Sequence, residues 1–243
     1  MSELVLVSIC GSSSIQVVLL DSGVPSLPRQ PWGKGKVDGI AGPAPTFGET
    51  GVAPGPLALD AARPYNAALQ HIRARVLARL GSHRIAAVAH RVVHGGAKYF
   101  DPVRVDAAVL ADLKTYIPLA PLHQPFALEA IETLLATAPG LPQVACFDTA
   151  FHHTLPDVEK MLPLPYDAWE RGLRRYGFHG LSYEFMSVAL AERHGDAAIG
   201  RTTAAHLGSG PSQCALPRLP SLATTLGSSA TNRLRIGQRC GPL

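Results

Sequence analysis

The sequence of 243 residues lacks a hydrophobic run long enough to span a membrane. A transmembrane helix needs about 20 consecutive apolar residues, and no run of even about 18 occurs. The first ten residues also lack the basic side chains that open a secretory signal peptide, since Glu3 is their only charged residue. We therefore expect a cytoplasmic protein with no membrane association.

Cysteine is scarce and widely spaced, at positions 10, 146, 214 and 240. No Cys-x-x-Cys pair is present, which excludes a zinc ribbon and a thioredoxin-like redox motif. Four isolated cysteines are compatible with the reducing cytoplasm.

Charged residues make up only 16% of the chain, with a formal net charge of +4. The basic residues are scattered and are not interleaved with aromatic residues, as they would be on a nucleic-acid-binding surface. We expect no nucleic-acid partner. An excess of positive charge around a small anionic substrate explains the balance equally well.

The order of apolar and polar residues predicts alternating strands and helices. Two β-rich runs, 3–9 and 15–21, are separated by a short turn and predict a hairpin. Residues 23–64 are rich in glycine and proline, which predicts loops with short strands. The pattern then predicts an amphipathic helix over 65–80 and a buried strand over 85–93.

A second helix is expected from Pro125 to Leu135, because proline is favoured in the first helical turn. A short strand over 144–147 and a helix after Gly180 follow. From Leu207 onward no hydrophobic period is apparent. The fold class is therefore mixed α/β, with a partly antiparallel sheet flanked by helices.

Several polar groups beside small residues are candidates for chemistry. The hydroxyl-rich turn at 10–14 could hold a phosphate or be an ordinary polar hairpin, and it is not a P-loop because it lacks the lysine and the following helix. Arg91 could clamp a carboxylate or phosphate, or belong to an ordinary polar cluster at the end of a strand. Asp148 could be catalytic or could cap a helical turn. His179 and Arg239 each lie between small residues, and isolated residues of these types are usually structural.

Five short motifs, taken together and in this order, resemble the acetate kinases. They are Cys-Gly-Ser-Ser-Ser at 10–14, His-Arg-Val-Val-His-Gly-Gly at 90–96, Leu-Ala-Pro-Leu-His at 119–123, Phe-Asp-Thr-Ala-Phe-His at 147–152, and Arg-Arg-Tyr-Gly-Phe-His-Gly at 174–180. The resemblance implies the actin-like (ribonuclease H-like) ATPase fold. It also implies reversible transfer of the γ-phosphoryl group of ATP to acetate, with ATP/ADP and Mg²⁺ as cofactors.

The same resemblance assigns roles to particular residues. It implies that the catalytic residues are Asp148, His179 and Arg239. It implies that acetate is bound by Arg91, with an apolar pocket for the methyl group formed by Val93, Leu122 and Phe178. It implies nucleotide contacts at Ser12, Ser14, Gln16, His206, Leu207, Gly208, Ser209 and Gly210.

Some positions depart from the family pattern. Ile9 stands where the family usually has an asparagine near the magnesium ion, so no metal ligand is assigned. Gln16 stands where the family usually has a lysine, and Ser209 replaces an asparagine. An apolar side chain cannot orient metal-bound water, and glutamine brings no charge to a phosphate.

The resemblance implies an amino-terminal acetate kinase domain over 1–148 and an incomplete start of the nucleotide-binding domain over 149–243. We therefore expect little activity from this chain by itself, and we do not expect the family's homodimer to persist. Alternatives are a propionate or butyrate kinase, because one methylene discriminates by only about 1 to 3 kcal/mol, and a non-catalytic remnant that binds an anion or a partner.

Overall fold

A computed structural model of the chain describes residues 2–24, 30–208 and 210–228. Residue contacts divide them into two compact units that interleave along the sequence. The first unit contains residues 2–92, 103–115 and 121–145, and the second contains residues 93–102, 116–120 and 146–228. The boundary expected at residue 148 stays a prediction.

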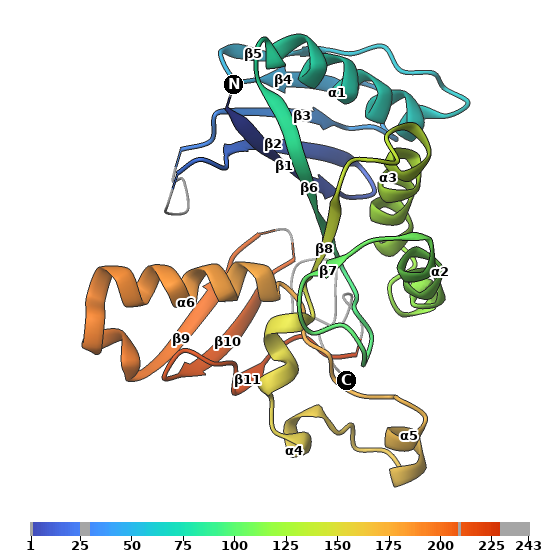
Figure 1. The fold of residues 1–243 in the computed structure, drawn as a ribbon. Coiled ribbons are helices and arrows are strands. Elements are labelled where there is room, and N and C mark those ends of the chain that lie inside the picture. Colours follow the sequence, from blue (N-terminus) through green and yellow to red (C-terminus); the bar gives the residue numbers. More distant parts are fainter. Residues whose placement is uncertain (1, 25–29, 209, 229–243) are drawn as a thin grey trace. The chain divides into compact units, whose positions relative to one another are not determined.

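The largest element is an eight-stranded mixed sheet in the order β5-β4-β3-β2-β1-β6-β8-β7 (Figure 1). Its strands are β1 (Glu3–Cys10), β2 (Ser14–Asp21), β3 (Gly33–Asp38), β4 (Thr46–Glu49), β5 (Val52–Pro56), β6 (Arg84–Val92), β7 (Val103–Arg104) and β8 (Gln143–Phe147). Strand β1 pairs antiparallel with β2 and parallel with β6. The hairpin and the mixed sheet predicted from the sequence are confirmed.

Side chains alternate between the two faces of this sheet, because successive residues of a strand point in opposite directions. In β2, Ile15, Val17 and Leu19 are buried, and the residues between them are partly exposed. The buried row lies on the face that the helices cover, and it forms the core of the first unit.

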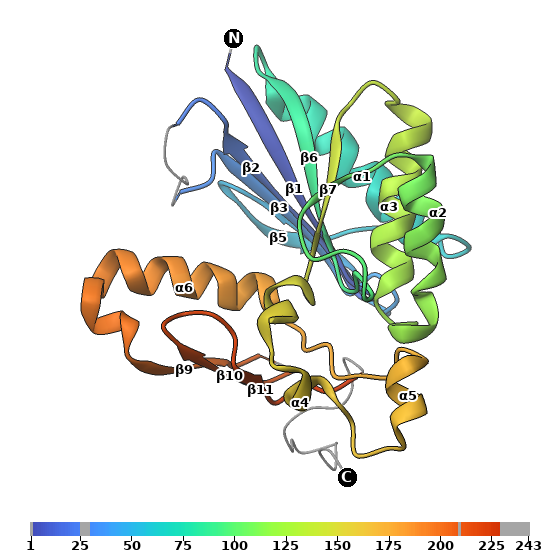
Figure 2. The ribbon, with the colours of Figure 1, turned by 60° about the horizontal axis from the view of Figure 1, so that its bottom comes forward.

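Three helices belong to the first unit, and two of them cover one face of the sheet (Figures 1 and 2). They are α1 (Pro64–Leu80), α2 (Ala107–Thr115) and α3 (Gln124–Thr137). Helix α1 packs over β2 and β3, α3 packs over β6 and β1, and α2 packs on α3. Prolines in the first turns of α1 and α3 confirm the expected starts of the two predicted helices.

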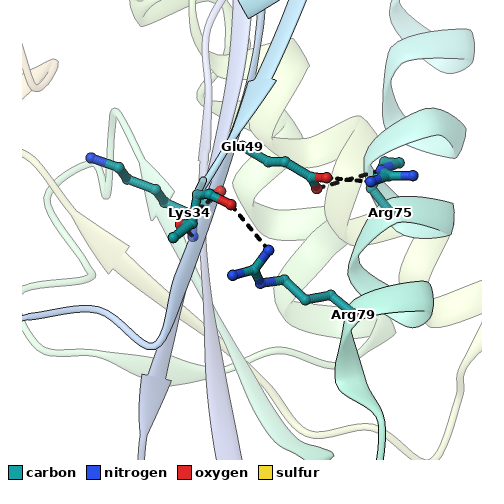
Figure 3. Close-up of polar contacts among 5 residues, drawn as sticks. Lys34, Glu49, Arg75 and Arg79 are labelled. Atoms are coloured by element: carbon teal, nitrogen blue, oxygen red, sulfur yellow. Dashed lines mark hydrogen bonds and ion pairs between the residues drawn. The ribbon is translucent and has the colours of Figure 1, made fainter. Parts of the chain in front are cut away.

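Charged side chains also tie α1 to the edge of the sheet (Figure 3). Arg75 forms an ion pair with Glu49 at the end of β4. Arg79 Nη1 donates a hydrogen bond to the backbone carbonyl oxygen of Thr50 at 3.2 Å. These contacts fix the side of α1 that faces β3 and β4.

The second unit combines short helices with a three-stranded antiparallel sheet in the order β11-β10-β9. Its elements are η1 (Ile117–Leu119), η2 (Ala150–Thr154), α4 (Asp157–Lys160), α5 (Tyr166–Glu170), α6 (Gly180–His194), η3 (Gly195–Ile199), β9 (Arg201–His206), β10 (Ser212–Pro217) and β11 (Ala223–Thr224). Helix α6 lies along β9 (Figure 2). Its Tyr183 packs with Ala204, Cys214 and Leu216 of the strands.

Strands β10 and β11 fall in the stretch where the sequence shows no hydrophobic period. The buried positions of β10 do alternate, but one of the three is Ser212, whose hydroxyl is satisfied inside the unit. Because serine is polar, its buried position does not count as apolar, and the alternation of apolar and polar residues expected for a strand is not seen in the sequence. No helix of the described ranges is both long and apolar enough to cross a membrane.

We expect the α3 core to be sensitive to truncation. The Ile131 side chain is fully buried, so Ile131→Ala should lower the free energy of unfolding by about 2 to 5 kcal/mol through lost burial and a cavity. Leu77→Ala in α1, where the side chain is 56% exposed, is the control and should cost less than about 1 kcal/mol. Denaturant unfolding monitored by circular dichroism measures both, and equal losses would contradict the packing described here.

Candidate active site

The β1–β2 turn presents the first group of candidate residues. The backbone N–H of Gly11 donates to the Ser14 carbonyl oxygen at 2.9 Å, and the N–H of Ile40 donates to the Ser13 carbonyl oxygen at 3.0 Å. Ser12 is exposed and Ser14 is partly exposed. The backbone of the turn is therefore fixed, and the Ser12 hydroxyl is presented at the surface of the first unit.

The strand register places four side chains in one row across neighbouring strands of the sheet. Arg91 of β6 lies opposite Ile9 of β1, Ile9 lies opposite Gln16 of β2, and Gln16 lies opposite Lys36 of β3. Residues directly opposite each other share a face, and this is the face away from α1 and α3, called here the far face. The structure thus brings Arg91 and Gln16 together on the far face, beside Lys36, to which the sequence reasoning assigned no role.

The two histidines next to Arg91 in the sequence do not join this row. His90 is buried on the helix-covered side, where its Nε2 lies 2.8 Å from Gln143 Oε1. Burial lowers the pKa of His90 to about 4, so the ring is neutral at pH 7. Strand alternation therefore places the His90 imidazole on the face opposite the Arg91 guanidinium.

His94 is buried in the second unit among aromatic rings. Its ring centroid lies 4.4 Å from that of Tyr176 and 5.6 Å from that of Phe178. The N–H of Gly96 donates to His94 Nδ1 at 2.9 Å, which makes Nδ1 an acceptor. Burial lowers the pKa of His94 to about 4. This histidine supports the walls of the site as a neutral ring.

Asp148 is joined by a backbone hydrogen bond to Gly180, the residue that follows His179, in the second unit. Asp148 directly follows β8 and is 2% exposed. The N–H of Gly180 donates to the Asp148 carbonyl oxygen at 2.7 Å. A Cβ at Gly180 would collide with that oxygen, so only glycine permits the approach. The start of α6 is thereby held against the end of β8.

The His179 side chain is oriented by three neighbours. Its Nδ1 is hydrogen bonded to Ser212 Oγ at 2.8 Å, and Ser212 Oγ is hydrogen bonded to the Tyr183 hydroxyl at 2.5 Å. The ring stacks on His206 with centroids 4.1 Å apart. His179 also has a φ of 60°, a left-handed conformation that is uncommon outside glycine and that concentrates at functional sites.

An apolar cluster lies next in sequence to His179. Val93 and Phe178 pack together with Ala120 and Leu226 in the second unit. Ala120, which lies in the motif at 119–123, and Leu226 were not assigned to the pocket from the sequence. Leu122, the third residue expected in the pocket, is 62% exposed and belongs to the first unit. Its role as a pocket residue stays a prediction.

The segment 206–210 begins at the end of β9. His206 Nδ1 is hydrogen bonded to Ser182 Oγ at 3.1 Å. Leu207 is 81% exposed, Gly208 is exposed and Gly210 is buried. Ser209 and Arg239 lie outside the described residues, so their expected roles also stay predictions.

A buried histidine that the sequence reasoning left unassigned supports the segment 177–179. His152 Nε2 donates to the Phe178 carbonyl oxygen at 3.0 Å, so Nδ1 accepts from the Ser221 hydroxyl at 2.8 Å. Burial lowers the pKa of His152 to about 4, which keeps the ring neutral. The motif at 147–152 therefore carries Asp148 at one end and a structural support for Phe178 at the other.

These contacts give the second unit a carboxylate, an oriented imidazole and an apolar cluster in adjoining segments. The first unit, taken by itself, carries a guanidinium, an ammonium and a hydroxyl-rich turn on neighbouring strands. Such groups suit phosphoryl transfer, in which positioning and charge neutralisation dominate.

Comparisons with known proteins agree with this chemistry. The model of the acetokinase family matches residues 4–243. The acetate kinase of Nitrobacter hamburgensis is 44% identical over 98% of this chain and 60% of its own length. An acetate kinase of Rhodopseudomonas palustris is 54% identical over 66% of this chain and 41% of its own length.

Two solved structures are similar over nearly the whole chain. The Porphyromonas gingivalis acetate kinase gives a TM-score of 0.81 at 33% identity, covering 99% of this chain and 61% of that one. A propionate kinase from Francisella tularensis gives 0.82 at 31% identity, covering 99% of this chain and 62% of that one. The likeness confirms the mixed α/β, actin-like ATPase fold. The chain spans about 60% of the length of these proteins.

The close packing of His152 against residue 177 predicts a large steric effect. Gly177→Ala combines a φ of 72° with a Cβ only 2.6 Å from the His152 ring, and Gly172→Ala has a φ of 83° and open space. Both substitutions are strained by their backbone conformation. We expect Gly177→Ala to lower the free energy of unfolding by at least about 2 kcal/mol more than Gly172→Ala. Denaturant unfolding measures the difference, and matching losses would show that residue 177 is not tightly packed.

The three buried neutral histidines predict acid sensitivity. The folded-state pKa values of His90, His94 and His152 are lowered to about 4, so the unfolded chain binds more protons between about pH 6.5 and 4. Their stabilising effect is complete above pH 6.5 and is lost as the pH falls toward 4. Each should contribute a loss of about 2 kcal/mol between pH 7 and pH 5. Unfolding midpoints measured at pH 7, 6 and 5 test this, and unchanged midpoints would refute it.

Proposed function

The chain belongs to the acetokinase family, and we propose that its site transfers the γ-phosphoryl group of ATP reversibly to acetate, giving acetyl phosphate and ADP. The observation that carries this proposal is the contact between the start of α6 and Asp148 in the second unit. There Asp148 and an oriented His179 are held beside an apolar cluster. Because the chain spans about 60% of its relatives' length, the activity is proposed for the whole protein. A cytoplasmic location is proposed with it.

The carboxylate end of the proposed site uses a cation and an apolar wall. Arg91 binds the acetate carboxylate, since a guanidinium can donate two parallel hydrogen bonds to it. Val93 and Phe178, which pack in one cluster, receive the methyl group, and the resemblance assigns Leu122 to the same role. A small apolar pocket with one cation selects short carboxylates.

The nucleotide end uses hydroxyls, backbone and loop residues. Ser12 and Ser14 of the fixed turn, together with Gln16, contact the phosphates of ATP or ADP. The second contact segment consists of His206, Leu207, Gly208, Ser209 and Gly210. Glycines let phosphate oxygens approach backbone N–H groups closely.

The proposed reaction needs no base to activate the nucleophile. Acetate is ionised at neutral pH, so one carboxylate oxygen attacks the γ-phosphorus directly as the bond from that phosphorus to the ADP oxygen breaks. Repulsion between the two anions is the main obstacle, and cationic and hydrogen-bonding groups such as Arg91, His179 and Arg239 reduce it. Asp148 orients its neighbours and removes no proton.

Mg²⁺ is a cofactor proposed from the family, and the described residues do not by themselves form a site for it. Within them, no group of three histidine, cysteine, aspartate or glutamate side chains could hold a metal ion. Ile9 offers no ligand atom at the position where the resemblance expects an asparagine. The proposed steps are therefore assigned to side chains alone.

A propionate kinase is the second candidate, favoured by the similarity to the Francisella tularensis propionate kinase. One methylene in an apolar pocket discriminates by only about 1 to 3 kcal/mol. Rates of hydroxamate formation on acetate and on propionate separate the two functions.

Arg91→Ala should abolish acetate binding by this chain, because the carboxylate loses its only proposed cation. Arg84→Ala is the matched control, since Arg84 lies at the opposite end of the same strand in an exposed ion pair with Glu3. Calorimetry measures acetate binding, and trapping of acetyl phosphate as its hydroxamate measures turnover. Where turnover is detectable, Arg91→Ala should reduce it by about 100-fold to 1000-fold.

The control decides how a loss is interpreted. A loss confined to Arg91→Ala supports the carboxylate site, and equal losses in both variants would point to damage to β6 instead. If the unmodified chain binds no acetate at all, the result favours an inert fragment over a residual acetate site in this chain.

A further inference from the structure

The far-face row across β6, β1, β2 and β3 carries a cation at each end. Arg91 lies at one end and Lys36 at the other, with Ile9 and Gln16 between them. Neighbouring strands are about 4.8 Å apart, so the two cationic residues are three strand spacings, or about 14 Å, apart at the backbone. Both have long side chains, and a carboxylate and a phosphate could be bound by the same row.

Gln16 cannot supply the positive charge that a phosphate site in this row requires. Its amide is neutral, and the resemblance places a phosphate contact at this position. Lys36 is the residue directly opposite Gln16 in the antiparallel pair. The Cβ atoms of such a pair lie about 4.5 to 5.5 Å apart, so the Lys36 and Gln16 side chains leave neighbouring positions on the same face.

We propose that Lys36 provides the positive charge for the phosphates of the nucleotide, in place of the residue at position 16. The inference rests on the proposed function and adds a specificity residue to it. Lys36 lies one far-face position from the end of β3 that is next to the β1–β2 turn. The pair at that end is Ser14 of β2 with Asp38 of β3. The Lys36 ammonium pairs with Asp38, so it is directed along β3 toward the level of Ser14.

Lys34 is a matched control on the same strand. It also lies on the far face, opposite Val18 and two residues farther from the turn. Figure 3 shows its side chain directed away from α1, on the other side of β3 from Arg75 and Arg79. Loss of Lys34 removes the same charge from the same face without touching the position beside Gln16.

Asp38 competes with a phosphate for Lys36. The Lys36 Nζ and Asp38 Oδ2 atoms lie 2.5 Å apart, and the two side chains are about half exposed (48% and 51%). Exposed ion pairs of this kind stabilise proteins only weakly. A phosphate with several anionic oxygens can therefore displace the carboxylate from the ammonium.

The test compares four variants of the chain: Lys36→Gln, Lys34→Gln, Gln16→Lys and the double variant Gln16→Lys/Lys36→Gln. Inorganic tripolyphosphate and MgATP are the binding probes, measured by calorimetry at low ionic strength. Hydroxamate formation from ATP and acetate is measured separately. Thermal unfolding checks that each variant is folded.

We expect Lys36→Gln to weaken tripolyphosphate binding about tenfold or more, Lys34→Gln to change it less than about threefold, and the double variant to recover most of the loss. Equal effects of Lys36→Gln and Lys34→Gln, or no recovery in the double variant, would overturn the inference and leave the kinase proposal intact. Lys36-dependent tripolyphosphate binding supports the inference whether or not this chain forms hydroxamate, because the kinase activity is proposed for the whole protein.

Discussion

The described site depends on one close approach of two backbone segments. The N–H of Gly180 donates to the carbonyl oxygen of Asp148, and no side chain fits between them. This contact holds the start of α6 against the end of β8, and it sets the positions of Asp148 and His179 together. Ser212 and His206 then fix the direction of the His179 ring. The role proposed for His179 depends on this arrangement, because electrostatic stabilisation requires groups that are already in place.

Burial divides the histidines into two kinds. His90, His94 and His152 are enclosed, and burial lowers their pKa values to about 4, so they act as neutral packing and hydrogen-bonding groups. His179 is only partly buried and is bonded to a serine hydroxyl. Neighbouring histidines in a motif therefore need not share a role. Of the enclosed ones, His94 and His152 contact Phe178, whereas His90 contacts Gln143 on the helix-covered side of the sheet.

Strand register has a comparable effect on the charged residues. Arg91 and Lys36 are 55 positions apart in the sequence, yet pairing through β1 and β2 places them in one row. Alternation along β6 sends His90 to the opposite face from Arg91. A change of register by one residue would exchange these faces, so the hydrophobic pattern that fixes the register also fixes which charges meet a ligand.

The sequence by itself determined the hairpin, the helices α1, α3 and α6, and the family, because periodicity and short motifs are local properties of the chain. It also indicated Asp148 and His179, which stand in such motifs beside glycines. It did not reveal β10, since a buried Ser212 interrupts the hydrophobic period, nor Ala120 and Leu226 in the apolar cluster. Only the tertiary structure decided that His90 turns inward and that Lys36 lies opposite Gln16. Those facts depend on pairing between distant segments, and no local pattern of residues records which strands become neighbours.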